Sequence, residues 1–596
     1  MDVHSCGNPE LARIRHIRLD LTVDFEKRRL SGTAELELAA PLPAGGTLRL
    51  DTRDLEIESV ESTGGAAPDS PAPHELGLRD PILGAPLSIS LPAGASGVRI
   101  RYSTSPAASG LQWLLPEQTA GRQKPFLFSQ AQAIHARSFV PCQDSPGVRV
   151  TFDAVIRTPS GIVAVMGAEN RSDPNEKGIY RFHMPQPVPP YLIAIAAGDL
   201  AFRSTGPRTG VWAEPSMVEA SAAEFADAEL MIAVTEKLFG EYRWGRFDVL
   251  VLPPSFPFGG MENPRLTFAT PTVLAGDKSL VSLVAHELAH SWSGNLVTNA
   301  AWADFWLNEG FTVYIERRIV EAIYGRPRSE MEWLLGRRDL SDAFADLADH
   351  PERTALRIDL TGHDPDDGMN KVPYEKGALF LRLLEETFGR DRFDAFLRAW
   401  FDGNAFQSRT TDDFQKFLEA SLLQISNEAA VAGQIDLRKW FDGPGLPASA
   451  PLAKSDALVQ AEFLARDWAA GKSTAANLPI RGWSFHETLH FLRSLPADIS
   501  ADRLAELDGA FGLTASGNSE IVSQWLLVAI RSGYHAADEK LRSFLVGMGR
   551  RKFLKPLYIE LMKTDSGKAA ARSIYAEARP RYHPIAQGTI DGIVGR

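Results

Sequence analysis

Alternating apolar positions dominate the first two hundred residues of the chain. In one early segment, apolar side chains occupy every second position, at Ile17, Leu19, Leu21, Val23 and Phe25, which puts them on one face of a β-strand. Further segments of this kind follow, separated by Pro and Gly: TLRLDT, LSISLP, GVRIRYST and VRVTFDAVIRTP. This spacing predicts a large antiparallel β domain over residues 1–200.

The apolar period becomes that of a helix after about residue 220. The helical segment SAAEFADAELMIAVTEKLFGEY precedes a predicted strand, FDVLVLPP, and a predicted long helix, KSLVSLVAHELAHSWSG. We assign residues 201–442 to a second, mixed domain. Residues 443–455, GPGLPASAPLAKS, have no periodicity and are rich in Gly, Pro, Ala and Ser, which is typical of a linker between domains.

Amphipathic helices fill the remaining residues, 456–596. Segments such as DALVQAEFLARDWAAG, SEIVSQWLLVAIRSG and ADEKLRSFLVGMG are joined by short turns. Such helices favour stacking in pairs as a small solenoid. The pattern of the whole chain therefore predicts an α+β multidomain protein with an α-helical, solenoid-like C-terminal domain.

Composition narrows the class of protein. The 596 residues are 44% hydrophobic and 23% charged, close to the averages for globular proteins. The 63 Lys and Arg against 75 Asp and Glu give a net charge of −12, which disfavours a nucleic-acid partner. No apolar run approaches the roughly 18 residues that a membrane helix needs, so we expect no membrane partner either.

Two features bear on the compartment. The first twenty residues lack the basic start and apolar stretch of a secretory signal. The two cysteines, Cys6 and Cys142, are too few and too far apart for a disulfide framework or a Cys-based zinc site. We therefore expect a cytoplasmic protein with reduced thiols. The sequence leaves the oligomeric state open, with a monomer slightly favoured.

Candidate metal ligands occur in the motif HELAH. Residues four apart share one face of a helix, so His286 and His290 can point at one metal while Glu287 projects beside it. A catalytic zinc takes three protein ligands and keeps a fourth position for water. The segment WLNEG supplies the third ligand, Glu309, nineteen residues after His290. This set would hold one Zn²⁺, with Glu287 as the general base that activates the attacking water.

The same pattern occurs a second time, as HETLH. Its histidines are His486 and His490, and its carboxylate is Glu487. Ser484 and Glu487 form Ser-x-x-Glu, the capping box of a helix start, and the position nineteen residues after the second histidine is Gly509. We therefore expect this copy to lie in the first turn of a helix and to hold no metal.

Together with GGMEN at residues 259–263, these motifs resemble those of the gluzincin zinc aminopeptidases, and more closely those of the leukotriene A-4 hydrolase branch. Similar phrases extend along nearly the whole chain, including LQWLLPEQTAG, LFSQAQAIHARSFVPCQDSP, HSWSGNLVTN, VPYEKG and GRRKFLKPL. The resemblance implies an N-terminal β saddle, a thermolysin-like catalytic domain at residues 201–442 and a helical C-terminal domain. It also implies a zinc aminopeptidase that acts on short peptides.

The resemblance implies roles for residues that bind the N-terminal end of a peptide. Glu262 of the Gly-x-Met-Glu-Asn segment would bind the free α-amine, with Gln132 of SQAQAIH as a second acceptor. The segment Gly259, Gly260 and Met261 would offer an open strand edge to the extended peptide.

Further residues match by the same resemblance. Tyr374 in VPYEKG would stabilise the oxyanion of the tetrahedral intermediate. Arg550 and Lys552 in GRRKFLKPL would hold the carboxylate of a short peptide or a fatty acid, and anchors at both ends predict a preference for tripeptides. Asp366 matches the acid that the branch uses to open a lipid epoxide, but Met369 replaces a second tyrosine of that reaction.

Three functions therefore remain under consideration. The first is a zinc aminopeptidase of short peptides. The second is a bifunctional lipid-epoxide hydrolase, which Asp366 favours and Met369 opposes. The third is an inactive scaffold, which the presence of all ligands, the base and the oxyanion donor disfavours.

Overall fold

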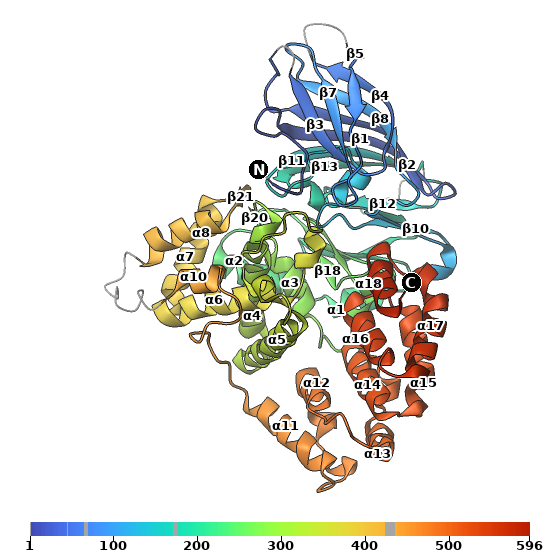
Figure 1. Ribbon diagram of the computed structural model, residues 1–596, viewed down its shortest axis with the longest axis vertical. Coiled ribbons are helices and arrows are strands. Elements are labelled where there is room, and N and C mark those ends of the chain that lie inside the picture. The colour runs from blue at the N-terminus through green and yellow to red at the C-terminus, as the bar shows by residue number, and fades with distance from the viewer. Residues whose placement is uncertain (1, 44–45, 65–68, 171–176, 424–434, 596) are drawn as a thin grey trace.

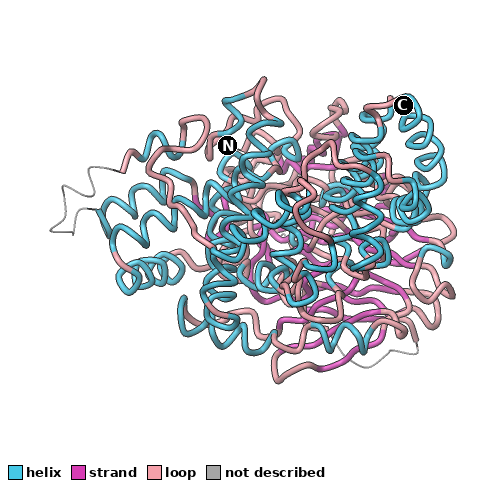
Figure 2. The backbone as a smooth tube through the Cα atoms, turned by 90° about the horizontal axis from the view of Figure 1, so that it is seen from below, coloured by secondary structure: helices cyan, strands magenta, loops and turns pink. Residues whose placement is uncertain are grey.

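The computed structural model describes residues 2–43, 46–64, 69–170, 177–423 and 435–595. A β-rich part, a mixed central part and a helical part follow one another along the chain (Figure 1). Viewed from below, helices cover most of the molecule and many strands lie behind them (Figure 2). The predicted α+β multidomain class is thus confirmed, while the boundaries at residues 200, 442 and 455 stay a proposal.

The β-rich part contains three sheets within its described residues. Their orders are β13-β11-β1-β2-β8-β4-β5, β3-β7-β6 and β12-β14-β10-β9. The strands are β1 (Ile14–Asp24), β2 (Arg29–Leu38), β3 (Thr47–Thr52), β4 (Glu56–Thr63), β5 (Ser70–Pro71), β6 (His74–Leu76), β7 (Ala85–Ser90), β8 (Gly97–Ser103), β9 (Leu111–Leu114), β10 (Phe126–Ser129), β11 (Val150–Arg157), β12 (Val163–Met166), β13 (Ile179–Val188) and β14 (Ile195–Gly198). The predicted alternation holds in β1, where Ile17, Leu19, Leu21 and Val23 are buried.

One strand pair departs from the predicted antiparallel arrangement. β1 pairs antiparallel with β2 but parallel with β11, with Leu19 opposite Ala154. Because β2 to β10 lie between β1 and β11 in the sequence, no tight hairpin fixes their relative direction. The prediction of an antiparallel β domain was therefore wrong for this pair.

The central part contains a five-stranded sheet with the order β15-β16-β17-β19-β18. Its strands are β15 (Ala201–Ser204), β16 (Thr209–Ala213), β17 (Phe247–Val251), β18 (Gly260–Met261) and β19 (Leu266–Ala269). β18 is an edge strand that pairs antiparallel with β19, with Gly260 opposite Ala269. Within the described residues its other edge has no partner strand, so that edge can accept an added strand.

Helices surround this sheet, and α4 lies among them in contact with α2, α3, α5 and α6. They are α1 (Val218–Glu224), α2 (Ala228–Phe239), α3 (Ser282–Ala289), α4 (Trp306–Tyr324), α5 (Arg326–Asp346), α6 (Lys371–Phe388), α7 (Arg390–Gly403), α8 (Thr411–Leu418) and α10 (Leu437–Phe441), and a short parallel pair joins β20 (Val297–Asn299) to β21 (Gln407–Arg409). The fully buried ring of Trp306 packs against those of Phe311, Phe380 and Phe441. This aromatic core fixes α4 and therefore the residues on its first turn.

The helix that carries HELAH is shorter than predicted. α3 ends at Ala289, and His290 is its C-cap residue rather than a mid-helix residue. The chain turns at Gly294, whose φ of 102° lies in the left-handed region that favours glycine. A Cβ there would also stand 2.4 Å from Asn308 Oδ1. The turn therefore depends on glycine and brings this segment close to α4.

The C-terminal part is helical in its described residues. Its helices are α11 (Asp456–Ala469), α12 (Phe485–Arg493), α13 (Ala501–Phe511), α14 (Ser519–Ser532), α15 (Asp538–Gly547), α16 (Arg551–Leu561), α17 (Asp565–Ala578) and α18 (Pro584–Val594). Helices two apart in the chain pack against each other: α12 on α14, α14 on α16, and α16 on α18. In the same way, α15 packs on α17. This alternation gives the two-layered, solenoid-like packing that the sequence predicts.

Residues 443–455 contain no helix or strand, but they are held in place. Lys376 Nζ donates to Gly443 O at 2.7 Å, and Arg337 Nη1 donates to Pro451 O at 3.1 Å. In the described part of the chain, every helix is too short or too polar to cross a membrane.

Candidate active site

Three side chains meet at the predicted metal site. The Nε2 atoms of His286 and His290 are 3.2 Å apart, and Glu309 Oε2 lies 3.3 Å from the first and 3.7 Å from the second. The segment that forms α3 supplies both histidines, and the first turn of α4 supplies Glu309. Ligand atoms of a tetrahedral zinc with bonds of about 2.0–2.1 Å lie roughly 3.3 Å apart, so the three atoms match that arrangement.

The partners of these side chains also fit a cation. Glu309 Oε2 is buried and accepts no hydrogen bond from any described residue. The far nitrogens of both rings are held: His286 Nδ1 lies 2.9 Å from Glu316 Oε2, and His290 Nδ1 lies 3.1 Å from Ser293 O. Such contacts orient a histidine so that Nε2 faces the metal. The residues present therefore fit a zinc ion.

Glu287 projects beside this triad from α3 and is buried. Burial raises the pKa of its carboxyl well above the usual range, which suits a group that must take up a proton and later release it. β18 runs directly over it, since a Cβ on Gly260 would stand 2.1 Å from Glu287 Oε1. Only glycine allows this close approach.

Glu262 and Gln132 are in contact, as a shared role in binding an amine requires. Gln132 Nε2 donates to Glu262 Oε1 at 3.1 Å, and Asn308 Nδ2 donates to the same oxygen at 3.3 Å. Ligand atoms of Glu262, Glu287 and His290 all lie within 4.8 Å of one another. The buried carboxyl oxygens thus form a cluster of hydrogen-bond acceptors next to the triad. Met261 contributes its backbone to β18, while its buried Sδ accepts a hydrogen bond from Gln130.

Tyr374 lies in the first turn of α6 and faces the triad. Its ring stacks on that of His286 at 6.1 Å and meets the Phe305 ring edge-on at 6.0 Å. Burial, with the nearby charge of Glu309, raises the pKa of its hydroxyl well above the usual range. The hydroxyl therefore stays protonated and can donate a hydrogen bond.

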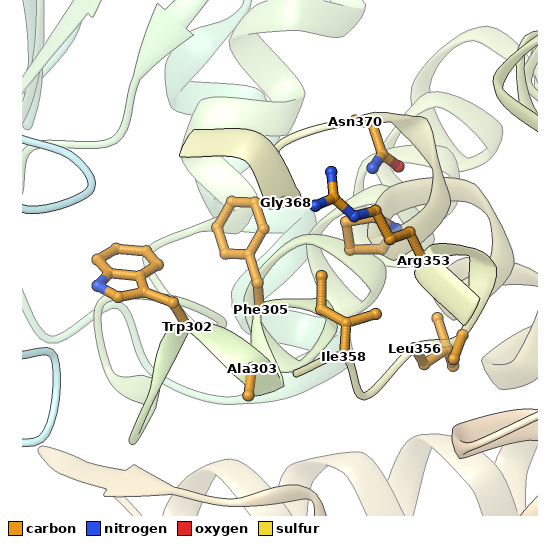
Figure 3. Close-up of a pocket in the computed structure, with 10 residues that line it drawn as sticks. Trp302, Ala303, Phe305, Arg353, Leu356, Ile358, Gly368 and Asn370 are labelled. Carbon is orange, nitrogen blue, oxygen red and sulfur yellow. The ribbon is translucent and has the colours of Figure 1, made fainter. Parts of the chain in front are cut away.

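A small cavity lies beside the start of α6 (Figure 3). Phe305, Ile358 and Asn370 line it, and its volume of about 10 Å³ is about the space of one water molecule. Asn370 also caps α6, because its side chain accepts a hydrogen bond from Val372 N at 2.8 Å.

Asp366 is bound to the loop that carries Gln132 rather than to the triad. Its Oδ1 accepts a hydrogen bond from Ala133 N at 3.3 Å, and its Oδ2 lies 3.3 Å from His135 Nε2. Burial alone would raise the pKa of Asp366, but His135 and nearby Arg551 outweigh it and lower that pKa below the usual value. The carboxylate is therefore charged.

Arg550 reaches β18 from the helical domain. Arg551 N donates to Pro257 O at 2.9 Å, which fixes the start of α16 against the catalytic domain. A Cβ on Gly259 would stand 2.7 Å from Arg550 Nη2, so this glycine makes room for the guanidinium. Lys552 is half-exposed, and its Nζ donates to Glu520 Oε1 at 2.7 Å.

The HETLH copy lies at the start of a helix, α12, as predicted. Ser484 and Glu487 form the capping box of α12, which confirms that interpretation. His486 Nε2 lies 3.3 Å from Glu332 Oε1, a carboxylate of α5. His490 lies in the second turn of α12 rather than the first, so the prediction was wrong on that point.

Three residues that the sequence did not single out complete the site. Glu316 holds His286, Asn308 holds Glu262, and Glu520 holds Lys552. A signal for Glu316 was available, because it follows Glu309 by seven residues and so lies on the same face of α4. Glu520 has no such local signal, because it is brought to the site by packing between distant helices.

Comparison with known proteins assigns the family. The chain matches the M1 peptidase N-terminal domain over residues 14–192, the peptidase family M1 domain over 223–434 and the leukotriene A4 hydrolase C-terminal domain over 483–594. It is 37% identical to leukotriene A-4 hydrolase of Xenopus laevis over 98% of each chain. The chain belongs to peptidase family M1.

Other M1 peptidases agree with this assignment. The chain is 36% identical to aminopeptidase B of Mus musculus, over 98% of this chain and 94% of that one. Its fold matches that of yeast LTA4 hydrolase in complex with bestatin with a TM-score of 0.92 and 33% identity, over 100% of this chain and 97% of that one. The M1 peptidase is thus an enzyme that hydrolyses peptide bonds, and its family implies zinc.

Proposed function

We propose that this M1 peptidase is a zinc aminopeptidase that removes the N-terminal residue from short peptides. The observation that carries the proposal is the cluster of buried acceptors formed by Glu262, with Gln132, beside Glu287 and His290. An ammonium bound there would lie next to the base, so the first peptide bond of the substrate would be the one within reach. A carboxylate so close to the base would obstruct the chain of an endopeptidase substrate.

Each side chain has a role in this proposal. His286, His290 and Glu309 would hold one Zn²⁺, which would polarise the scissile carbonyl and lower the pKa of the attacking water. Glu287 takes a proton from that water and passes it to the leaving nitrogen. Tyr374 donates a hydrogen bond to the oxyanion as it forms.

A binding site for the C-terminal carboxylate of the peptide would give the enzyme a preference for tripeptides, and Arg550 is the residue proposed to form it. Arg550 Nε is buried, and no described residue accepts a hydrogen bond from Nε or Nη2. Elsewhere in the protein, the same edge of Arg79 binds Asp54 through Nε at 2.8 Å and Nη2 at 3.0 Å. The open edge of Arg550 therefore suits the C-terminal carboxylate of a peptide laid along β18.

The compartment belongs to the proposal as well. Cys6 and Cys142 are both free thiols, in keeping with a reducing compartment, and we propose a cytoplasmic location. A fractionation of the native cells, with the protein followed by antibody, tests it; recovery in the membrane or secreted fraction would contradict it.

A panel of aminoacyl chromogenic substrates, each with a free and an N-acetylated amine, tests the activity. The account predicts hydrolysis of the free forms and loss of nearly all activity on acetylation, since Glu262 binds the ammonium. Equal cleavage of acetylated substrates would contradict the exopeptidase assignment. The same panel reports the preferred N-terminal side chain.

Lipid-epoxide hydrolysis stays as a second candidate function. The similarity to leukotriene A-4 hydrolase and the charged Asp366 favour it, whereas Met369 opposes it. Incubation with a fatty-acid epoxide, followed by chromatography of the products, tests it. Formation of an enzymatic diol that is lost in Asp366→Asn would support this function.

A further inference from the structure

Glu520 lies between the two cations of the proposed carboxylate anchor. Its Oε1 accepts hydrogen bonds from Lys552 Nζ at 2.7 Å and from Arg550 Nη1 at 3.5 Å. It stands in the first turn of α14, after the N-cap residue Asn518, where the helix dipole favours a negative charge. Glu520 and Arg550 are only 8% and 9% exposed, so water screens their charges poorly.

The carboxylate of Glu520 is charged. Burial alone would raise its pKa, but Lys552 and Arg550 outweigh burial and hold the pKa below the usual value. Among the other ionisable groups nearby, Asp339 and Arg493 pair with each other at 2.8 Å, while Lys371 lies near Lys552 and Glu287 lies near Arg550. The group of Arg550, Lys552 and Glu520 therefore has one net positive charge.

Contacts other than that with Glu520 fix the position of Arg550. Its Nη1 also donates to Thr272 Oγ1 at 3.0 Å, and its guanidinium lies over the Phe553 ring at 5.0 Å. The backbone on its C-terminal side is bound to Pro257 through Arg551 N. Because the hydrogen bond that Arg550 donates to Glu520, at 3.5 Å, is longer than the one it donates to Thr272, the main effect of Glu520 on Arg550 is its charge.

We infer that Glu520 is a specificity-determining residue, which limits the anchor to one net positive charge and so matches it to a peptide end with a single carboxylate. This inference rests on the proposed function, because it concerns the same substrate site. Glu520 occupies Nη1 of Arg550 and leaves the Nε and Nη2 edge for the ligand. A C-terminal Asp or Glu carries two negative charges and exceeds what the group neutralises, whereas a neutral C-terminal residue matches it.

Glu520→Gln tests the inference, because glutamine keeps an oxygen acceptor for Lys552 and Arg550 but removes the charge. The measured quantity is the ratio of kcat/KM for a tripeptide with a free C-terminal carboxylate to kcat/KM for its C-terminal amide. We expect the ratio to rise about three- to tenfold in the variant, in line with one unit charge at close range. We also expect the KM for a tripeptide ending in Asp to fall by more than that for one ending in Ala.

A double variant that restores the net charge of the anchor gives a second test. Lys552→Gln together with Glu520→Gln again leaves one net positive charge, so its ratio should return close to that of wild type. This double variant separates the effect of charge from that of packing. It restores the net charge of the anchor, but it alters the contact between residues 520 and 552 further. Glu560→Gln is the matched control. It removes the charge of a buried carboxylate on α16 that accepts hydrogen bonds from Arg531 and Lys563, and it should leave the ratio unchanged.

Each outcome decides between the alternatives. An unchanged or lower ratio in Glu520→Gln, or a double variant that stays at the ratio of the single one, overturns the inference. The ratio cancels a general loss of folded enzyme, so reduced stability does not obscure the result. If wild type itself cleaves the acid and the amide alike, the carboxylate anchor of the proposed function is wrong, whereas cleavage of aminoacyl chromogenic substrates would still support the aminopeptidase.

Discussion

A Cβ atom on Gly260 would stand 2.1 Å from Oε1 of Glu287. The edge strand that would bind the peptide and the carboxylate that would act as base thus touch at a position where only glycine fits. Gly259 has the same relationship to Arg550, at 2.7 Å from Nη2. The two glycines of GGMEN therefore set the distances from the peptide edge to the base and to the anchor.

Gly260→Ala should lower kcat by at least about a hundredfold and leave the bound metal in place, because the methyl group displaces Glu287 and not the metal ligands. Steady-state kinetics and metal analysis of the same preparation measure both. Gly403→Ala is the control, since a Cβ there meets no atom within 4 Å. Near-normal kcat in Gly260→Ala would show that the base does not need its observed position.

Tyr374→Phe should retain the metal and lose kcat by about a hundred- to a thousandfold, since a donor that acts on the oxyanion contributes about 3 to 4 kcal/mol to the transition state. KM should change little. Kinetics with one good aminoacyl substrate give both parameters. A variant that keeps most of its kcat would remove Tyr374 from the chemistry.

Glu316→Gln should weaken zinc binding about ten- to a hundredfold, because the carboxylate that orients His286 Nδ1 at 2.9 Å is lost. Competition with a chelator, followed by zinc release over time, measures the affinity. Glu321→Gln on the same helix, which loses only a pairing with Arg390, serves as control. Equal affinities in the two variants would mean that Glu316 has no role in holding the metal.

We expect the buried side chain of His583 to make the free energy of unfolding depend on pH. Burial is the main cause that lowers its pKa from 6.5 to about 3. The folded state therefore stays neutral there while the unfolded state takes up a proton, so the contribution is present above pH 6.5 and is lost as the pH falls towards 3. The loss amounts to at most about 1.4 kcal/mol per pH unit.

We expect wild type to lose more Tm than His583→Asn between pH 7 and pH 5. Asparagine keeps the cap of α18, where His583 Nδ1 accepts from Ile585 N at 3.1 Å. His535→Asn, on the surface of the same domain, is the control. Parallel Tm curves for wild type and His583→Asn would contradict the assignment of a neutral buried histidine.

Local spacing made part of the site predictable. His286, Glu287 and His290 occupy a single turn of helix, so their relation is contained in five consecutive residues. Glu309 required a second, separate motif. Glu520 and Asn308 could not be found in this way, because hydrogen bonds between segments far apart in the sequence leave no period in it.

For the fold, too, local patterns were predictable from the sequence and contacts between distant segments were not. The alternation in β1 predicted its buried face, since that pattern needs only one strand. The parallel partner of β1 could not be predicted, because strand order depends on packing across more than one hundred residues of intervening chain. The end of α3 was missed for a similar reason: the turn at Gly294 lies against Asn308 on another helix, where a Cβ would not fit.

Zinc content of wild type, Glu309→Ala and His490→Ala, measured per chain alongside aminopeptidase activity, tests the central claim most directly. The account predicts one zinc and full activity in wild type and in His490→Ala, because His490 lies on α12 near Glu462 and away from the triad. Glu309→Ala should lose most of its zinc and its activity together. Retention of zinc by Glu309→Ala, or its loss from His490→Ala, would contradict the assignment of the metal site to His286, His290 and Glu309.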